Sequence, residues 1–458
     1  MKKLTRTISG VTPVAVMSRP APCPGECVYC PDFNDTPRSY TPHSPAVLRA
    51  ATRGYDAGEQ VKLRLRILKD MGHPTDKIEL IVMGGTFLST PLDYQNGFIK
   101  ACFDALNGTE SETLTDAQRT NETAEHRAVG LCIETRPDVC DDDDVARMVG
   151  WGATRVEMGV QTLDDDIYRL VKRGHDASAV VAATARLRNA GLKVHYHWMP
   201  GLPGATPERD LELTRQLFDD PAYRPDGLKI YPTMVVEGTV LEDWHRTGRY
   251  TPYPDEVMTA LIASMKKLVP PYVRISRVLR DIPVEYITGG LKNSMRDDVR
   301  ERLERDGAAC RCIRCREYGH RMRQKAVIGS PSLRRLDYET AGGREIFLSY
   351  EDENGTLFGM LRLRIQDFLP LELTSAAGPA ALIRELHVYG PEMELGERDD
   401  NSAQHRGFGR GLVGEAERIA REEYGASMIA VLSGVGARAY YRELGFTAES
   451  GYMVKSLE

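Results

Sequence analysis

The sequence has no hydrophobic run long enough to span a membrane, so we expect no membrane-bound segment. Its first apolar run, Val11 to Met17, is short and is interrupted by Pro13, which argues against a signal peptide. Cysteine is scarce, and six of the nine cysteines fall in two tight clusters. We therefore expect a cytoplasmic protein, in which disulfides are rare and clustered thiols bind metal.

An excess of basic residues is also lacking, because the net charge is −6 at pH 7. This excludes a protein that is basic over its whole surface, although a local basic patch remains compatible with it. Hydrophobic residues make up 41% of the chain and charged residues 28%, as in ordinary soluble proteins. A length of 458 residues exceeds one ordinary core, and we expect two or three domains.

Short apolar runs alternate with helix-like stretches through the first 280 residues. This rhythm favours parallel βα units, and six such strands predict an incomplete barrel rather than a closed eight-stranded one. The polar segment Asn107–Glu125 is interpreted as an exposed excursion between a strand and a helix, with disorder as one interpretation. The predicted strands are Ile78–Met83, Ala128–Ile133, Arg155–Val160, Leu192–Trp198, Leu228–Tyr231 and Tyr272–Ile275.

The pattern changes after Arg296, where a charged helix leads into the second cysteine cluster. Two runs in which apolar residues alternate with others then flank Asn354-Gly355, a dipeptide that is typical of a β-hairpin turn. A strand, a glycine-rich turn, a helix and another strand follow, as in a smaller α+β domain. We predict a first domain over residues 1–300, a linker over 301–329 and a second domain over 330–458.

The first cluster has the spacing C-x3-C-x2-C and comprises Cys23, Cys27 and Cys30. Three thiolates on one short loop can each bind one iron of a 4Fe–4S cube, which leaves the fourth iron for a small-molecule chelate. A zinc site is the alternative, with His43 as a fourth ligand. The position of the loop before the first βα unit favours the iron–sulfur interpretation.

With Tyr29 before its third cysteine, this loop resembles the signature of the radical S-adenosylmethionine superfamily. The resemblance implies that the chain binds a 4Fe–4S cluster and S-adenosylmethionine. At the superfamily's glycine-rich turn this sequence ends in Thr86 where glutamate is usual, which puts the role of that residue in doubt. The residues that the resemblance assigns to S-adenosylmethionine are Gly84, Gly85, Thr86, Glu134, Gln161, Gly201 and Gly204.

The second cluster is Cys310, Cys312 and Cys315, with His320 shortly after it. Three thiolates and one imidazole complete a tetrahedral zinc site, and this structural zinc is our expectation. A second iron–sulfur cluster is the rival interpretation. Cys102, Cys132 and Cys140 are scattered and are expected to be core or surface residues.

Basic residues surround this second cluster, and more occur near the N-terminus and just upstream. In an acidic chain, such a patch favours a polyanion over a merely solvated surface, and nucleic acid is the leading candidate. The residues predicted to bind RNA are Lys2, Lys3, Arg274, Arg277, Arg280, Arg311, Arg314, Arg316, Arg321, Arg323 and Lys325.

Near the C-terminus the motif Q-x-x-G-x-G precedes a predicted helix. Glycines there let backbone N–H groups approach a pyrophosphate at the helix N-terminus. With Tyr440 and Tyr441 near the end, the segment resembles the GNAT acetyltransferase fold. The resemblance implies that the chain binds acetyl-coenzyme A and that Tyr441 lies beside the thioester sulfur. The residues assigned to this donor are Leu386, His387, Val388, Gln404, Gly407, Phe408, Gly409, Arg410, Gly411, Tyr440 and Tyr441.

The two halves and the basic linker, in this order, resemble the catalytic subunit of Elongator and its stand-alone bacterial and archaeal relatives. The resemblance covers nearly the whole chain and implies carboxymethylation of carbon 5 of the wobble uridine, position 34, of transfer RNA. Catalytic candidates are Tyr441, Tyr440 and Lys229, for which a surface lysine is the alternative. Expected partners are the anticodon loop, acetyl-coenzyme A and an electron donor, with a homodimer as a further expectation.

Two rival functions remain at this stage. One is a protein lysine acetyltransferase in which the cysteine loop holds a purely structural cluster. The other is a non-catalytic module that binds transfer RNA and recruits partners. Both cofactor motifs are complete in the sequence, which argues against the second rival.

Overall fold

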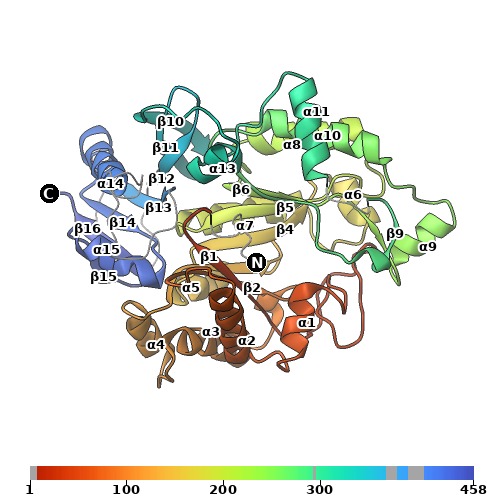
Figure 1. The fold of residues 1–458 in the computed structure, drawn as a ribbon, viewed down its shortest axis with the longest axis horizontal. Coiled ribbons are helices and arrows are strands. Elements are labelled where there is room, and N and C mark those ends of the chain that lie inside the picture. Colours follow the sequence, from red (N-terminus) through yellow and green to blue (C-terminus); the bar gives the residue numbers. More distant parts are fainter. Residues whose placement is uncertain (1–7, 292–294, 368–378, 390–406) are drawn as a thin grey trace.

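The computed structural model describes residues 8–291, 295–367, 379–389 and 407–458. Two seven-stranded sheets organise these residues, and they occupy neighbouring parts of the molecule in Figure 1. Within the described ranges, no helix has both the length and the apolarity that crossing a bilayer requires.

The first sheet is entirely parallel, with the order β1-β2-β3-β4-β5-β6-β8. Its strands are β1 (Thr12–Met17), β2 (Lys77–Met83), β3 (Arg127–Thr135), β4 (Arg155–Gln161), β5 (Lys193–Trp198), β6 (Gly227–Ile230) and β8 (Arg274–Val278). The helices around it are α1 (Pro45–Ala51), α2 (Ala57–Asp70), α3 (Leu92–Asn107), α4 (Leu114–Asn121), α5 (Asp142–Gly150), α6 (Asp165–Leu170), α7 (Ala177–Asn189), α8 (Pro207–Asp219), α9 (Val240–Arg246) and α10 (Asp255–Leu268). The predicted incomplete barrel is confirmed, but the prediction of six strands is wrong.

The missed strand is β1, at the edge of the sheet. Val14 and Val16 alternate with less buried residues and are themselves fully buried, as a strand requires. Pro13 is compatible with this position because an edge strand has one side free of ladder hydrogen bonds. The run that argued against a signal peptide is therefore part of the core.

The helices begin at recognisable caps. In α5, the Asp141 side chain accepts from the Asp144 backbone N–H while the Asp144 carboxylate accepts from the Asp141 N–H, which forms a capping box. The interpretation of Asn107–Glu125 as disordered is wrong, because α4 forms within it and begins at a Thr113 cap. Asn121 at the end of α4 is buried and donates to Asn107 Oδ1 at 2.8 Å, which ties the segment to α3.

The linker folds against both sheets. Its helices are α11 (Arg296–Arg305), α12 (Ile313–Arg316) and α13 (Tyr318–Arg323), and a short pair, β7 (Val235–Val236) with β9 (Ile287–Gly289), lies before it. Between α12 and α13, Glu317 is fully buried and bridges to Leu357 of the second sheet. Arg274 at the start of β8 forms an ion pair with Glu317 at 2.8 Å, which ties the linker to the first sheet.

The second sheet is mixed, with the order β10-β11-β12-β13-β14-β16-β15. Its strands are β10 (Ser332–Thr340), β11 (Gly343–Glu351), β12 (Leu357–Gln366), β13 (Ala380–Val388), β14 (Met428–Val431), β15 (Thr447–Glu449) and β16 (Tyr452–Ser456). Helix α14 (Phe408–Arg418), a π-helical turn (Ile419–Glu423), a 3-10 turn (Val435–Ala437) and α15 (Arg438–Arg442) accompany it. The predicted hairpin turn is confirmed between β11 and β12, where Gly355 adopts a positive φ of 74°.

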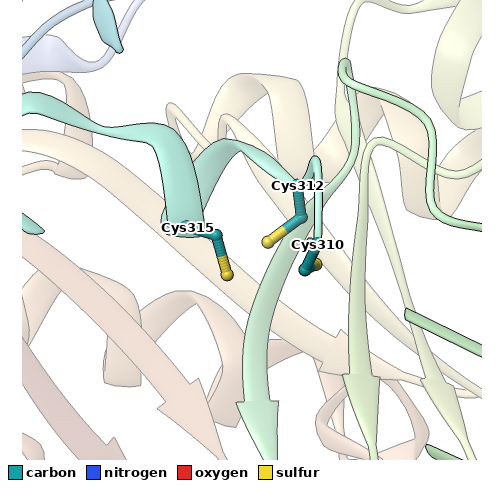
Figure 2. A group of neighbouring side chains, drawn as sticks. All are labelled: Cys310, Cys312 and Cys315. Atoms are coloured by element: carbon teal, nitrogen blue, oxygen red, sulfur yellow. The ribbon is translucent and has the colours of Figure 1, made fainter. Parts of the chain in front are cut away.

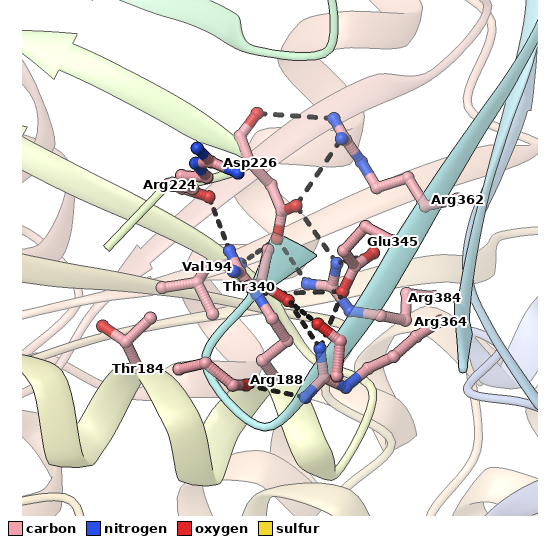
Figure 3. Close-up of polar contacts among 12 residues, drawn as sticks. Thr184, Arg188, Val194, Arg224, Asp226, Thr340, Glu345, Arg362, Arg364 and Arg384 are labelled. Atoms are coloured by element: carbon pink, nitrogen blue, oxygen red, sulfur yellow. Dashed lines mark hydrogen bonds and ion pairs between the residues drawn. The ribbon is translucent and has the colours of Figure 1, made fainter. Parts of the chain in front are cut away.

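A network of buried charges joins the two sheets (Figure 3). Arg384 of β13 donates to Asp226 Oδ1 at 3.1 Å and to Glu345 Oε2 at 2.9 Å, and all three side chains are buried. Burial opposes ionisation of Asp226, but the three arginines around it, Arg384 foremost, hold the pKa of this carboxyl well below its usual range. Because each charge has a partner, we expect the network to fix how the sheets meet.

The second sheet therefore meets the first at the amino ends of the barrel strands. Asp226 immediately precedes β6, and Arg384 also donates to the carbonyl of Leu192, directly before β5, at 2.9 Å. Arg362 of β12 donates to the carbonyl of Tyr272, just before β8, at 2.7 Å. The first cysteine cluster follows β1 and so lies toward the carboxyl ends of the strands.

Candidate active site

One cavity of about 1450 Å³ runs the length of the half-barrel and reaches both domains. At the carboxyl ends of the strands it is lined by the three cysteines of the first cluster. At the amino ends it is lined by the second domain. The first residue of five strands faces it, and in each the residue is basic: Lys77, Arg127, Arg155, Lys193 and Arg274. Arginines and lysines far outnumber acidic residues in this lining, although the chain as a whole is acidic.

The cysteine loop is fixed by its neighbours. The Val28 N–H donates to the Val171 carbonyl at 3.1 Å, and the Val28 carbonyl accepts from the Leu241 N–H at 2.8 Å. Cys23 Sγ lies 3.7 Å from Thr86 Oγ1, so the residue that departs from the superfamily pattern contacts this loop. Burial opposes ionisation of Cys27, but Arg173 outweighs it and lowers the pKa of this thiol.

The turn after β2 faces the cavity and has a backbone that only glycine adopts easily. Gly84 and Gly85 have positive φ values of 138° and 79°, and a Cβ on Gly84 would overlap Ser18 Oγ. Gly85 and Thr86 line the cavity. Gln161 also lines it, has a positive φ of 74°, and carries a buried Oε1 atom without a hydrogen-bond partner. An unpartnered buried acceptor beside a cavity fits a bound polar ligand.

A charged group occupies the middle of the half-barrel. Lys229 Nζ lies 3.3 Å from Glu134 Oε1 and also contacts Glu157, whose Oε2 lies 3.2 Å from His197 Nε2. Burial opposes the charge on Lys229, but these carboxylates, Glu157 foremost, raise its pKa well above the usual value. Tyr40 donates to Glu134 at 3.0 Å. Lys229 is thus a half-buried residue of the cavity wall, and its interpretation as a surface lysine is wrong.

Two of the glycines predicted to bind S-adenosylmethionine lie beside the cavity rather than in it. Neither Gly201 nor Gly204 is among the residues that line the cavity, whereas Met199 is. The Gly201 N–H donates to Asp210 at 2.8 Å, and its carbonyl accepts from Tyr250 at 2.7 Å. The role of these glycines in binding S-adenosylmethionine stays a prediction.

The glycine motif of the second domain opens helix α14. Gly407 caps the helix with a positive φ of 74°, and Gly409 lies against Tyr440, whose buried hydroxyl has no hydrogen-bond partner. Tyr441 is also buried and packs in the core of the second sheet. The geometry thus brings the Tyr440 hydroxyl, rather than that of Tyr441, to the glycine turn. Both tyrosines line the cavity, as do Leu386, His387, Val388, Gly407, Gly409 and Arg410.

The remaining residues assigned to acetyl-coenzyme A lie in different surroundings. Gln404 lies outside the described residues. Phe408 packs with Phe358 in a small aromatic cluster, and Gly411 lies against Tyr350, so neither lines the cavity. His387 Nε2 lies 2.8 Å from the carbonyl oxygen of Ser9, which links β13 to the N-terminal segment.

The three thiols of the second cluster converge in Figure 2, where Cys310 and Cys312 lie before α12 and Cys315 within it. Their sulfur atoms all lie within 4.8 Å of one another. Hydrogen bonds from Cys310 and Cys315 lower the pKa of the Cys312 thiol well below its usual value. His320 does not join this group, because its Nε2 lies 3.0 Å from Glu317 Oε1. The predicted set of three thiols and one imidazole is therefore not assembled.

The basic residues predicted to bind RNA fall into three groups. Arg274, Arg277, Arg280 and Arg314 line the cavity, although Arg274 is held by Glu317. Arg311, Arg323 and Lys325 are exposed on the linker, whereas Arg316 is tied to Glu351 at 2.7 Å and Arg321 is only partly exposed. Lys2 and Lys3 lie outside the described residues.

Among the cavity residues that sequence reasoning missed are Glu157, His197, Arg136 and Arg173. Glu157 lies four residues before Gln161 on β4 and therefore faces the same side of the sheet, so strand alternation could have found it. The same alternation along β5 could have found His197. Arg136 directly follows β3, whereas nothing in the local pattern marks Arg173.

Comparison with known proteins agrees with this geometry. The model of the radical SAM superfamily matches residues 21–217, that of the radical SAM C-terminal domain matches 225–305, and that of the acetyltransferase (GNAT) family matches 312–446. The chain is 63% identical over 459 residues to a tRNA uridine(34) acetyltransferase of Dehalococcoides mccartyi, with all of both chains covered.

More distant relatives match over the same length. Elongator complex protein 3 of Homo sapiens is 42% identical, with 100% of this chain and 86% of that protein covered. The solved structure of the archaeal Methanocaldococcus infernus Elp3, lacking its N-terminal residues, superimposes with a TM-score of 0.87 at 43% identity. The superposition covers 98% of this chain and 100% of the archaeal chain. The chain belongs to the family of the tRNA uridine(34) acetyltransferases and Elongator complex protein 3, which joins a radical SAM half-barrel to a GNAT domain.

Proposed function

We propose that this protein modifies the wobble uridine of transfer RNA, with acetyl-coenzyme A as donor and S-adenosylmethionine as radical source. The product is a carboxymethyl group on carbon 5 of uridine 34. The observation that carries the proposal is the single cavity that contains both the three-cysteine loop and the GNAT glycine turn. The relatives that are named tRNA uridine(34) acetyltransferases support this substrate.

Cys23, Cys27 and Cys30 would hold the 4Fe–4S cluster, because three free thiols on one fixed loop suit a cluster with one open iron. Gly85, Thr86, Glu134 and Gln161 would hold S-adenosylmethionine, and the unpartnered Gln161 Oε1 supports this. When bound, these groups supply a carbon radical that can remove hydrogen from an unactivated methyl group, such as that of an acetyl thioester. We assign Lys229 and its carboxylate partners to orienting polar groups of cofactor or substrate.

The second domain would present the donor. The N-terminus of α14 offers backbone N–H groups and a favourable dipole to the pyrophosphate of coenzyme A. Tyr440, with its unpartnered hydroxyl beside Gly409, is the better placed of the two tyrosines to bind the donor. Because its pKa is raised by burial, this hydroxyl stays protonated at neutral pH and can donate to a departing thiolate.

Transfer RNA would approach the basic cavity with its anticodon loop. Arg277 and Arg280 in the lining, and the exposed Arg311, Arg323 and Lys325 on the linker, can contact phosphates. A target base must leave its stack to enter such a cavity, which costs less in a loop than in a duplex.

The second cysteine cluster is assigned to structural zinc, because three sulfurs within 4.8 Å of one another suit one small ion. This assignment leaves the fourth ligand open, since His320 lies with Glu317. We assign residues 1–300 to the radical domain, 301–329 to the zinc linker and 330–458 to the GNAT domain. An external electron donor is required, and a homodimer and a cytoplasmic location complete the proposal.

The test is anaerobic and uses the whole chain. The cluster is reconstituted, and S-adenosylmethionine, dithionite, acetyl-coenzyme A and bulk transfer RNA are added before nucleosides are analysed by mass spectrometry. We expect 5-carboxymethyluridine from the wild type and none from Cys27→Ala. Cleaved S-adenosylmethionine without a modified uridine would reject the substrate. Acetylation of an added peptide by both the wild type and Cys27→Ala would instead support a lysine acetyltransferase. Tight RNA binding without cleavage of S-adenosylmethionine would support a non-catalytic binding module.

A further inference from the structure

Two buried arginines flank the first cysteine loop. Arg136 follows β3 and is 3% exposed, and Arg173 follows α6 and is 6% exposed. Both line the cavity, and neither belongs to any motif for cofactor or substrate. A buried guanidinium is costly unless its charge serves a partner, so the contacts of this arginine pair require an explanation.

Arg173 points at the loop itself. Its Nη1 donates to Cys27 Sγ at 3.4 Å, and its Nη2 donates to the carbonyl of Gly159 at the inner face of β4. Its Nε donates to His175 Nε2 at 3.0 Å. The turn that carries Arg173 also accepts the backbone hydrogen bond from Val28, so the arginine and the loop are held together.

Arg136 supports this arrangement from the other side. Its Nε and Nη2 donate to both oxygens of Asp138 at 2.9 and 2.8 Å, and Nη2 also donates to the Arg173 carbonyl at 2.8 Å. Its Nη1 is buried and has no hydrogen-bond partner. A Cβ on Gly25 would overlap this nitrogen, so the guanidinium lies directly against the cysteine loop.

The charges of the pair do not cancel. Asp138 neutralises Arg136, whereas no carboxylate forms an ion pair with Arg173 within the part of the chain that the structure describes. The other acceptors of Arg173 are the Gly159 carbonyl and His175. Burial and Arg173 lower the pKa of His175 to about 4, so this imidazole is neutral at pH 7. One uncompensated positive charge is therefore directed at Cys27.

We propose that Arg173, held in place by Arg136, is a positioning residue that sets the reduction potential of the cluster bound by this loop. The inference rests on the cluster assignment of the proposed function. One electron from an external donor adds one negative charge to the cluster, and no bond changes in this step. A fixed cation and an N–H···S hydrogen bond stabilise the added charge in a dry site, which makes the cluster easier to reduce.

The experiment is a redox titration of the reconstituted full-length protein, followed by the electron paramagnetic resonance signal of the reduced cluster. At the wild-type midpoint potential, Arg173→Met should lower the ratio of reduced to oxidised cluster at least tenfold, which corresponds to about 59 mV for one electron. Arg173→Lys keeps the charge and should stay within about threefold of the wild type. Arg169→Met removes an exposed arginine four residues earlier, within α6, and should change nothing.

Each remaining outcome has a definite meaning. An unchanged ratio in Arg173→Met with full iron content overturns the inference, and so does an equal shift in Arg169→Met. If Arg173→Met fails to load iron, Arg173→Gln is titrated in its place, and an unchanged ratio in that variant overturns the inference. A wild-type protein without any cluster signal would reject the cluster assignment itself, which separates the two failures.

Discussion

The chain carries two groups of three cysteines, and they are built differently. The sulfurs of Cys310, Cys312 and Cys315 lie within 4.8 Å of one another, whereas Cys23, Cys27 and Cys30 do not form such a group. A single zinc ion requires convergent sulfurs, whereas three irons of a cube require sulfurs that stand apart. The closeness of the thiols thus distinguishes the two proposed metal sites, which differ little in sequence spacing.

The difference begins with one interval in each motif. Two residues separate Cys27 from Cys30, and the Cys30 N–H donates to the Cys27 carbonyl at 3.0 Å in the turn between them. Two residues likewise separate Cys312 from Cys315. Three residues separate Cys23 from Cys27, and Cys23 reaches away to Thr86. Only Arg311 separates Cys310 from Cys312, which keeps their sulfurs together. The spacing between the first two cysteines of each motif therefore determines whether the three sulfurs stand apart or converge.

The largest expected effect separates the two sites by their metals. Cys27→Ser should lose the iron and all modification activity but retain zinc, because the second cluster shares no residue with the first. Cys312→Ser should lose zinc and retain iron, with a lower thermal midpoint since the linker is tied to both sheets. Elemental analysis of the reconstituted proteins measures both metals. Loss of both metals from either variant would contradict the independence of the two sites.

The second expected effect concerns the cavity, which the first cysteine cluster lines and the second does not. Lys229→Met leaves the buried Glu134 without its cation and Glu157 with Arg155 alone, and we expect a loss of about 3 kcal/mol of stability with about a hundredfold loss of product. Adding Glu157→Gln restores the charge balance. The double variant should recover most of its thermal midpoint but not its activity. Recovery of both would mean that Lys229 only balances charge, and equal iron content in all proteins is the control.

A third effect concerns the anchor beside the second cluster. Arg274 and His320 outweigh burial and lower the pKa of Glu317 to about 2 from the ordinary 4.5. A lowered folded-state pKa gives stability that is present above about pH 4.5 and is lost as the pH falls toward 2. Glu317→Gln should therefore cost about 3 kcal/mol at neutral pH and less than half of that at pH 3. Urea unfolding at both pH values, with exposed Glu353→Gln as control, measures the difference. A constant deficit would contradict the ionic origin.

Much of this comparison could be predicted from the sequence, because motifs of fixed spacing occupy one local segment. The cysteine loops, the Gly84-Gly85 turn and the glycine motif before α14 are of this kind. The half-barrel followed from the alternation of apolar runs and helices. Strand β1 was missed because Pro13 weakened its pattern, and only the sheet shows that the strand lies at an edge.

Other features depend on residues that are far apart in the chain. Arg173 meets Cys27 across 146 residues, and Arg384 meets Asp226 across 158 residues, so neither contact leaves a local pattern. The continuity of the cavity through the barrel likewise follows from how the two domains meet. His320 was predicted as a ligand from spacing alone, yet the buried Glu317, three residues earlier, is its partner.

The smallest expected effect tests that last point. If His320 were the fourth ligand, His320→Ala would leave three thiolates around the ion and lower zinc affinity by about tenfold or more. The structure instead pairs His320 with Glu317 outside the group of sulfurs, so we expect unchanged zinc content. Competition with a coloured chelator at pH 7 measures the affinity, and Cys315→Ala is the positive control. A loss in His320→Ala that matches the control would return the imidazole to the metal and require Glu317 to release it.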